Sequence, residues 1–179
     1  MAYSYKFYKE EIKEYLVSKF KGNAKVLDVG AGEGTYWNLL HEYYKTIDAV
    51  EVFKSNIENY KLKEKYHKVY NIDIKDFKYS NYDIIIFGDI IEHLEVKEAQ
   101  EVLNYAYTHC KEMIVAVPYE LEQGIAEDNI YEIHKQPDLT PKNILERYPM
   151  LKLLKKNELY GYYVKKENVW MTKRNIKKY

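Results

Sequence analysis

The chain has 179 residues, 46% of them hydrophobic and 31% charged, which is typical of one globular domain and excludes a disordered protein. Its 28 basic and 28 acidic residues cancel, and Arg147 and Arg174 are its only arginines, so a large nucleic-acid-binding face is disfavoured. A single cysteine, Cys110, excludes an internal disulfide and a cysteine-cluster zinc site.

Strand and helix patterns alternate along the chain from its N-terminus. Residues 1–22 carry an apolar stripe at helical spacing and predict an N-terminal helix. Short apolar, β-branched runs that are typical of buried strands follow at 25–29, 46–52, 68–73, 82–89 and 113–118. Helical spacing returns between them at 37–44, at Ser55 with Glu58 in a capping-box pattern, and at 99–110. This alternation predicts crossover units around a parallel sheet that is covered on both faces.

The pattern changes after the fifth predicted strand. Residues 118–138 form a long polar stretch with no clear periodicity, and a loop of this length in a compact domain is usually a lid or a binding loop. A helix is predicted to open at Thr140, which is followed by proline. The segments 151–156 and 158–166 are then expected to form an antiparallel pair at the edge of the sheet.

The predicted fold class is α/β: a doubly wound, mostly parallel, seven-stranded Rossmann-like sheet with an antiparallel edge strand and helices on both faces. One domain is expected over residues 1–165, with the loop 118–138 on the acceptor side. The basic tail 166–179 is expected to be solvated.

The stretch VLDVGAGEGTY places Gly30, Gly32 and Gly34 at a strand-to-helix turn. Glycines at such a turn allow positive φ angles and let a ligand touch the backbone directly. The dinucleotide fingerprint is G-x-G-x-x-G, whereas the third glycine here comes one residue early. Asp28 and Glu33 would also repel a pyrophosphate. Two carboxylates instead suit a ligand that carries an ammonium and a sulfonium.

The pattern from Asp28 to Gly34 resembles motif I of the class I S-adenosylmethionine-dependent methyltransferases, and the resemblance extends over residues 24–165. It implies S-adenosylmethionine as cofactor and S-adenosylhomocysteine as product. The residues that it assigns to cofactor binding are Asp28, Gly30, Ala31, Gly32, Glu51, Val52, Asp73, Ile74, Gly88 and Asp89.

Acidic residues recur at the ends of four successive predicted strands, as a cofactor lying across the sheet would require. In the family that this sequence resembles, the position of Glu51 binds both ribose hydroxyls, and one carboxylate does offer two acceptor oxygens to a cis-diol. In the same family, the positions that match Asp73 and Ile74 lie beside the adenine. Asp89 is expected near the methionine end of the cofactor.

Two histidines are predicted to be catalytic. His93, in DIIEHL, lies in a segment that resembles ubiquinone-biosynthesis-type small-molecule methyltransferases, and His134 lies in the long loop. Either would act as a base or as an orienting group for an acceptor nucleophile. Tyr119 and Tyr131 would help to shape the acceptor pocket. The alternative is that His93 packs against the next helix and that His134 is merely exposed.

Asp89, Glu92, His93 and His134 also resemble the metal-binding set of RNA-terminal ribose methyltransferases, which have an acid-x-x-Glu-His segment and a distant histidine. The first acid of the segment would be Asp89, whose side chain is shorter than the match requires. The neutral net charge and the scarcity of arginine also argue against an RNA substrate. The sequence therefore assigns no metal ligand and disfavours a nucleic-acid partner, and the metal-assisted RNA-terminal ribose methyltransferase is kept as an alternative.

The predicted function is methyl transfer to an oxygen or nitrogen of a small-molecule or glycan-like acceptor. An inactive, cofactor-binding partner subunit is the alternative from another class, since the chain is too short for a separate acceptor-binding domain. A nicotinamide oxidoreductase is disfavoured by the glycine spacing, and GDII stands where DNA amino-methyltransferases carry Asn-Pro-Pro-aromatic. With no signal-peptide pattern and no membrane-length apolar run, we expect a cytoplasmic protein without a membrane partner.

Overall fold

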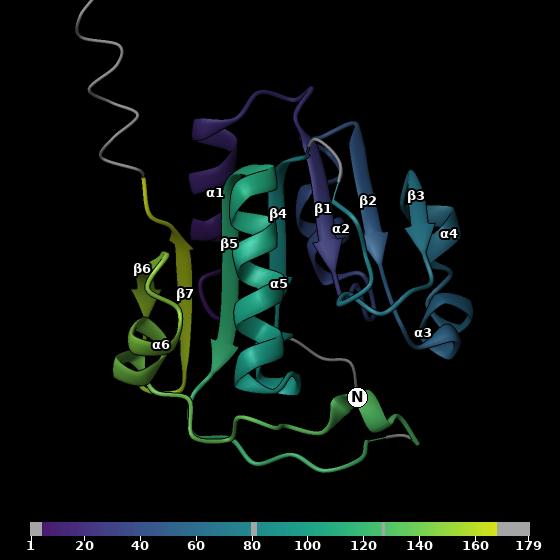
Figure 1. Ribbon diagram of the computed structural model, residues 1–179. Coiled ribbons are helices and arrows are strands. Elements are labelled where there is room, and N and C mark those ends of the chain that lie inside the picture. Colours follow the sequence, from purple (N-terminus) through teal and green to yellow (C-terminus); the bar gives the residue numbers. More distant parts are fainter. Residues whose placement is uncertain (1–4, 80–81, 127, 168–179) are drawn as a thin grey trace, which may run out of the picture.

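A computed structural model describes residues 5–79, 82–126 and 128–167 (Figure 1). Its strands are β1 (Lys25–Val29), β2 (Thr46–Val50), β3 (Lys68–Tyr70), β4 (Tyr82–Gly88), β5 (Cys110–Pro118), β6 (Leu151–Lys156) and β7 (Tyr160–Lys165). Its helices are α1 (Lys9–Lys19), α2 (Thr35–Leu40), α3 (Lys54–Asn59), α4 (Leu62–Lys65), α5 (Val96–His109) and α6 (Pro141–Arg147), with 3-10 turns η1 (Ile91–His93) and η2 (Ile130–Glu132).

Within these residues the strands form one seven-stranded sheet in the order β3-β2-β1-β4-β5-β7-β6. The first five strands pair in parallel, whereas β7 runs antiparallel to both β5 and β6. The predicted fold class is confirmed, with the antiparallel strand one position inside the edge. The parallel strands all end at the same edge of the sheet, and the loop after β5 runs along that edge (Figure 1).

The apolar character of the strands follows from burial on both faces. In β4, Ile84 and Ile86 belong to the core cluster that holds the buried residues of α1 to α4, and Ile85 and Phe87 belong to the cluster on the α5 and α6 side. All four side chains are 0% exposed. Because successive side chains of a strand point to opposite faces, a strand covered on both sides needs a continuous apolar run. Figure 1 shows α5 in front of the sheet and α1 behind it.

Two helix starts differ from the prediction. The first described helix begins at Lys9, because Tyr8 has a left-handed backbone with φ of 56°. Helix α3 begins at Lys54, with Phe53 as its N-cap and no side-chain cap, so the predicted capping role of Ser55 is wrong. Ser55 lies within the first turn, where its side chain cannot take the N-cap position.

The later elements follow the prediction. Helix α6 starts after Thr140, whose side chain and that of Asn143 form a reciprocal capping box. The two strands expected at 151–156 and 158–166 pair antiparallel as β6 and β7. The predicted solvated tail lies outside the described residues from 168 onward. Among the residues described, no helix has the length and apolar character that a membrane span requires.

Replacing Gly88 with alanine should lower the free energy of unfolding by about 1–3 kcal/mol, the usual cost of overpacking a core. A Cβ atom at Gly88 would lie 2.1 Å from Cε2 of Tyr36, whose side chain is buried. Urea unfolding measures the change. Gly124→Ala is the matched control, since a Cβ there meets nothing within 4 Å. Equal stability of the two variants would contradict this packing of Tyr36 against β4.

Candidate active site

The glycine loop connects β1 to α2 and has a left-handed backbone at each of its glycines. The φ angles of Gly30, Gly32 and Gly34 are 67°, 51° and 89°. Residues that carry a Cβ atom rarely adopt such positive φ angles. The Gly30 amide donates to the Val50 carbonyl at 2.8 Å and ties the loop to the end of β2. A Cβ at Gly30 would lie 1.9 Å from Cδ1 of Ile90. The bare backbone is therefore required by both conformation and space.

Asp28 lies beneath this loop and is 1% exposed. The Tyr66 hydroxyl donates to its Oδ2 atom at 2.5 Å. Burial raises the pKa of Asp28 to about 7, against the opposing effects of the Tyr66 hydrogen bond and the Lys9 ammonium. The Asp28 side chain is thus a buried acid that is held by Tyr66.

Glu51, at the end of β2, is bonded to the glycine loop. Its carboxylate accepts from the Gly32 amide at 2.9 Å and from the Phe53 amide at 2.8 Å. Burial raises the pKa of Glu51, and these two amide hydrogen bonds oppose that effect. No pattern in the sequence pointed to this bond to Gly32, which joins two loops that are distant along the chain.

Two adjoining cavities lie along the carboxyl ends of the parallel strands, with volumes of about 380 and 350 Å³. The first brings together most of the predicted site residues: Gly30, Ala31, Gly32, Glu51, Val52, Gly88, Asp89, His93 and His134. The second is lined by Asp73 and Ile74, the two residues predicted near the adenine. Gly30, Val52, Ile90, His93 and Tyr131 line both. Asp28 lines neither, because it is buried beneath the loop.

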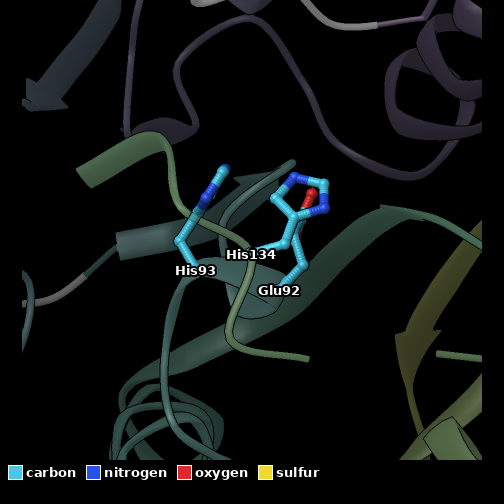
Figure 2. Close-up of side chains that lie close together, drawn as sticks. All are labelled: Glu92, His93 and His134. Carbon is cyan, nitrogen blue, oxygen red and sulfur yellow. The ribbon is translucent and has the colours of Figure 1, made fainter. Parts of the chain in front are cut away.

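Glu92, His93 and His134 converge on the first cavity from η1 and from the loop after β5 (Figure 2). One ligand atom from each lies within 4.8 Å of the others, and the two imidazole centroids are 4.8 Å apart. Glu92 is 1% exposed, and neither carboxylate oxygen has a hydrogen-bond partner among the described residues. Burial, and then the nearby Asp89 carboxylate, raise the pKa of Glu92 well above its ordinary value. Asp89 is not part of this cluster.

The two imidazole rings are oriented by main-chain carbonyls. Nδ1 of His93 lies 3.3 Å from the Ile133 carbonyl, and Nδ1 of His134 lies 2.7 Å from the Leu121 carbonyl. A carbonyl can only accept, so these contacts favour the tautomer in which Nδ1 carries the proton and Nε2 has the lone pair. The main chain of Glu132 and of Asp89 also interacts with the His93 ring. Burial, and then His134, lower the pKa of His93 to about 4.

Gln136 holds the long loop against η1. Its side-chain amide donates to the carbonyls of Ile91 at 2.8 Å and Leu94 at 2.9 Å, and its oxygen accepts from the Tyr148 hydroxyl at 2.8 Å. The side chain is buried, and this anchor lies two residues from His134. Gln136 was not predicted as a site residue, because a single glutamine in a polar loop carries no periodic signal.

The two tyrosines proposed for the acceptor pocket have different positions. Tyr131 lines both cavities. Tyr119 is instead buried, with its hydroxyl 2.7 Å from that of Tyr163, so its predicted place in the pocket is wrong. Gly161 leaves the space that the Tyr119 ring occupies, because a Cβ there would lie 1.8 Å from the Tyr119 hydroxyl.

The profile of the family described as "Methyltransferase domain" matches residues 2–123. The chain belongs to this family. A comparison with curated proteins found no match. The family resemblance predicted from the glycine loop is therefore confirmed.

Solved methyltransferase structures share the fold. Magnesium protoporphyrin IX methyltransferase from Synechocystis with bound S-adenosylhomocysteine is 11% identical, with a TM-score of 0.65 over 87% of this chain and 80% of that chain. The methyltransferase domain of bacterial CtHen1 is 21% identical, with a TM-score of 0.66 over 89% and 97%. An S-adenosylmethionine-dependent methyltransferase from Clostridium acetobutylicum is 12% identical, with a TM-score of 0.67 over 90% and 91%.

Proposed function

We propose that this methyltransferase binds S-adenosylmethionine across the two adjoining cavities. The adenine would lie in the second cavity beside Asp73 and Ile74, and the ribose hydroxyls would bond to Glu51. The methionine end would lie between the glycine loop and Asp89. Related structures crystallised with S-adenosylmethionine or S-adenosylhomocysteine support the choice of cofactor.

S-adenosylmethionine and S-adenosylhomocysteine should both bind, and NAD should not. Asp89, which lines the first cavity, favours a ligand with an ammonium and disfavours a pyrophosphate at the same place. Titration calorimetry with the three ligands tests this directly. Tighter binding of NAD than of either sulfur compound would overturn the cofactor assignment.

We further propose that the acceptor is a small or glycan-like molecule whose nucleophile meets the methyl group beside His93 and His134. The observation that carries this proposal is the orientation of the two rings, which leaves Nε2 of each as the atom that can take a proton. The sulfonium is already a good leaving group, so alignment and proton removal are the tasks left to the protein. The first cavity, of about 380 Å³, has the size of a small-molecule site.

A second candidate function is metal-assisted methylation of a ribose hydroxyl at an RNA end. Glu92 supports it, because a buried carboxylate without a hydrogen-bond partner among the described residues, next to two histidine nitrogens, suits a divalent ion. Each histidine Nδ1 lies against a carbonyl, which is a usual partner for the second nitrogen of a metal-bound imidazole. Glu92, His93 and His134 would hold the ion, which would polarise the acceptor hydroxyl.

Transfer of labelled methyl groups to sugars, phenols, amines and short RNA decides between these functions. The first proposal expects turnover of a small acceptor that is insensitive to chelators. The second expects turnover of RNA that a chelator abolishes and manganese restores. Cofactor binding without turnover of any acceptor class would favour an inactive partner subunit.

A further inference from the structure

The first cavity is lined by acids that no basic side chain in its wall balances. Its lining includes four carboxylates, those of Glu51, Asp89, Glu92 and Glu132. Of the described residues that line it, none is a lysine or an arginine. The second cavity does contain lysines, and each of them is paired with carboxylates. Carboxylates that share one cavity repel one another, so the first cavity favours a ligand that brings positive charge.

The proposed cofactor placement accounts for two of these acids. Glu51 would bond to the ribose hydroxyls, and Asp89 would face the ammonium of the methionine. Glu92, from η1, and Glu132, from η2 in the loop after β5, then remain for the acceptor. The inference drawn from them therefore rests on the proposed function.

Glu132 is oriented by two neutral side chains of its own loop. Nε2 of Gln123 donates to its Oε2 atom at 3.2 Å, and Nδ2 of Asn129 donates to its Oε1 atom at 3.3 Å. These amides leave the negative charge in place, and each oxygen keeps a lone pair for a ligand. Burial raises the pKa of Glu51 and of Glu92, and the nearby Glu132 carboxylate adds to the effect on both.

Glu92 gives independent evidence for a cation on this side of the cavity. Its side chain is 1% exposed, and neither oxygen has a hydrogen-bond partner among the described residues. Its carboxylate lies beside the His134 ring (Figure 2). A buried carboxylate in this state is costly unless a cation or a donor approaches it. We propose that the acceptor carries a protonated amine, which binds between Glu92 and Glu132 as an ammonium group.

A divalent metal ion is the other cation that suits Glu92. It would be held by Glu92, His93 and His134, but Glu132 does not belong to that cluster, and its charge would stay unbalanced. An ammonium group has three N–H donors and can be shared by two carboxylates. The acceptor class that this arrangement favours is a small amine, such as an amino sugar, rather than a neutral or anionic compound.

Transfer of labelled methyl groups to acceptors that differ only in charge tests this inference. The probes are small primary amines, each assayed beside its neutral N-acetyl derivative: glucosamine with N-acetylglucosamine, and tyramine with N-acetyltyramine. The amine of a pair should show a kcat/KM at least about tenfold higher, the usual effect of a hydrogen bond to a charged group.

Glu132→Gln should raise the KM for the amine about 10- to 100-fold for the same reason, with little change in kcat. The affinity for S-adenosylmethionine, measured by calorimetry, should not change. Glu122→Gln is the matched control, because Glu122 is an exposed acid of the same loop that lines neither cavity. Its KM for the amine should equal that of the wild type.

Four results would overturn the inference. Turnover of the neutral derivatives alone, or of no amine while S-adenosylmethionine binds, would exclude an ammonium-bearing acceptor. A loss of cofactor affinity in Glu132→Gln would place this residue at the cofactor. Turnover of the amine that a chelator abolishes would identify a metal as the cation at Glu92. Failure of the proposed function looks different, because the wild type would then bind no S-adenosylmethionine or methylate no acceptor of any charge.

Discussion

Replacing either His93 or His134 with alanine should lower turnover of an identified acceptor about 10²–10⁴-fold, the range that a positioned base contributes. Both rings line the first cavity, and both are fixed by main-chain carbonyls, so neither has to reorient before it takes a proton. Affinity for S-adenosylmethionine should stay nearly constant in His134→Ala, because the proposed adenine, ribose and methionine contacts come from other residues. His93→Ala should change this affinity far less than it changes turnover, since His93 also lines the second cavity. The measurement is steady-state turnover together with cofactor titration for each variant.

His109→Ala is the control for this pair, since His109 lies partly buried at the end of α5, and its ring nitrogen is bonded to Thr108 and Tyr105 of its own helix. Its turnover should equal that of the wild type. A chelator separates the two roles of the histidines: it leaves turnover unchanged if a histidine acts as a base and abolishes it if both bind a metal. Normal turnover in both alanine variants would assign His93 and His134 a structural role and move the acceptor site toward Tyr131.

Most of the sheet was predictable because its signal is local. Strands β1, β2, β4 and β5 are mostly apolar and end at or next to a glycine, proline or acid, and such a run predicts a strand covered on both faces. Strand β3 has only three residues and none of them is buried. The glycine loop was predictable for the same reason, since positive φ angles at Gly30, Gly32 and Gly34 need a residue type that the sequence displays. The predicted acids at strand ends share one edge because parallel strands end together.

The contacts that complete the site were not predictable, since they join segments far apart in the chain. Glu51 and Gly32 are separated by 19 positions, and Gln136 and Ile91 by 45. The prediction for Tyr119 was wrong for a related reason. A tyrosine ring suits a protein core as well as a ligand pocket, and its place in the core depends on the space beside Gly161, which is distant in the sequence.

Glu51 combines two tasks that a substitution series can separate. Its carboxylate already accepts two amide hydrogen bonds, from Gly32 and Phe53, and each carboxylate oxygen has a second lone pair for a ribose hydroxyl. The Glu51→Gln substitution would keep one acceptor oxygen but present an amide to a backbone donor, whereas Glu51→Ala would remove both acceptors. Loss of the bond to Gly32 would also loosen the glycine loop.

Glu51→Ala should therefore weaken S-adenosylmethionine binding about 100-fold or more, because two bonds to a carboxylate are lost at about 1.5–3 kcal/mol each. Glu51→Gln should show a smaller loss, and the exposed Glu58→Gln, on the neighbouring helix α3, should show none. Calorimetry measures the affinities, and urea unfolding checks that each variant is folded. A dideoxyribose analogue of S-adenosylhomocysteine, which lacks both hydroxyls, should lose much less affinity than the parent compound on Glu51→Ala, because only the effect on the loop remains. If Glu51→Ala instead weakens this analogue as much as the parent compound, the carboxylate acts through the loop alone, and the ribose must be placed elsewhere.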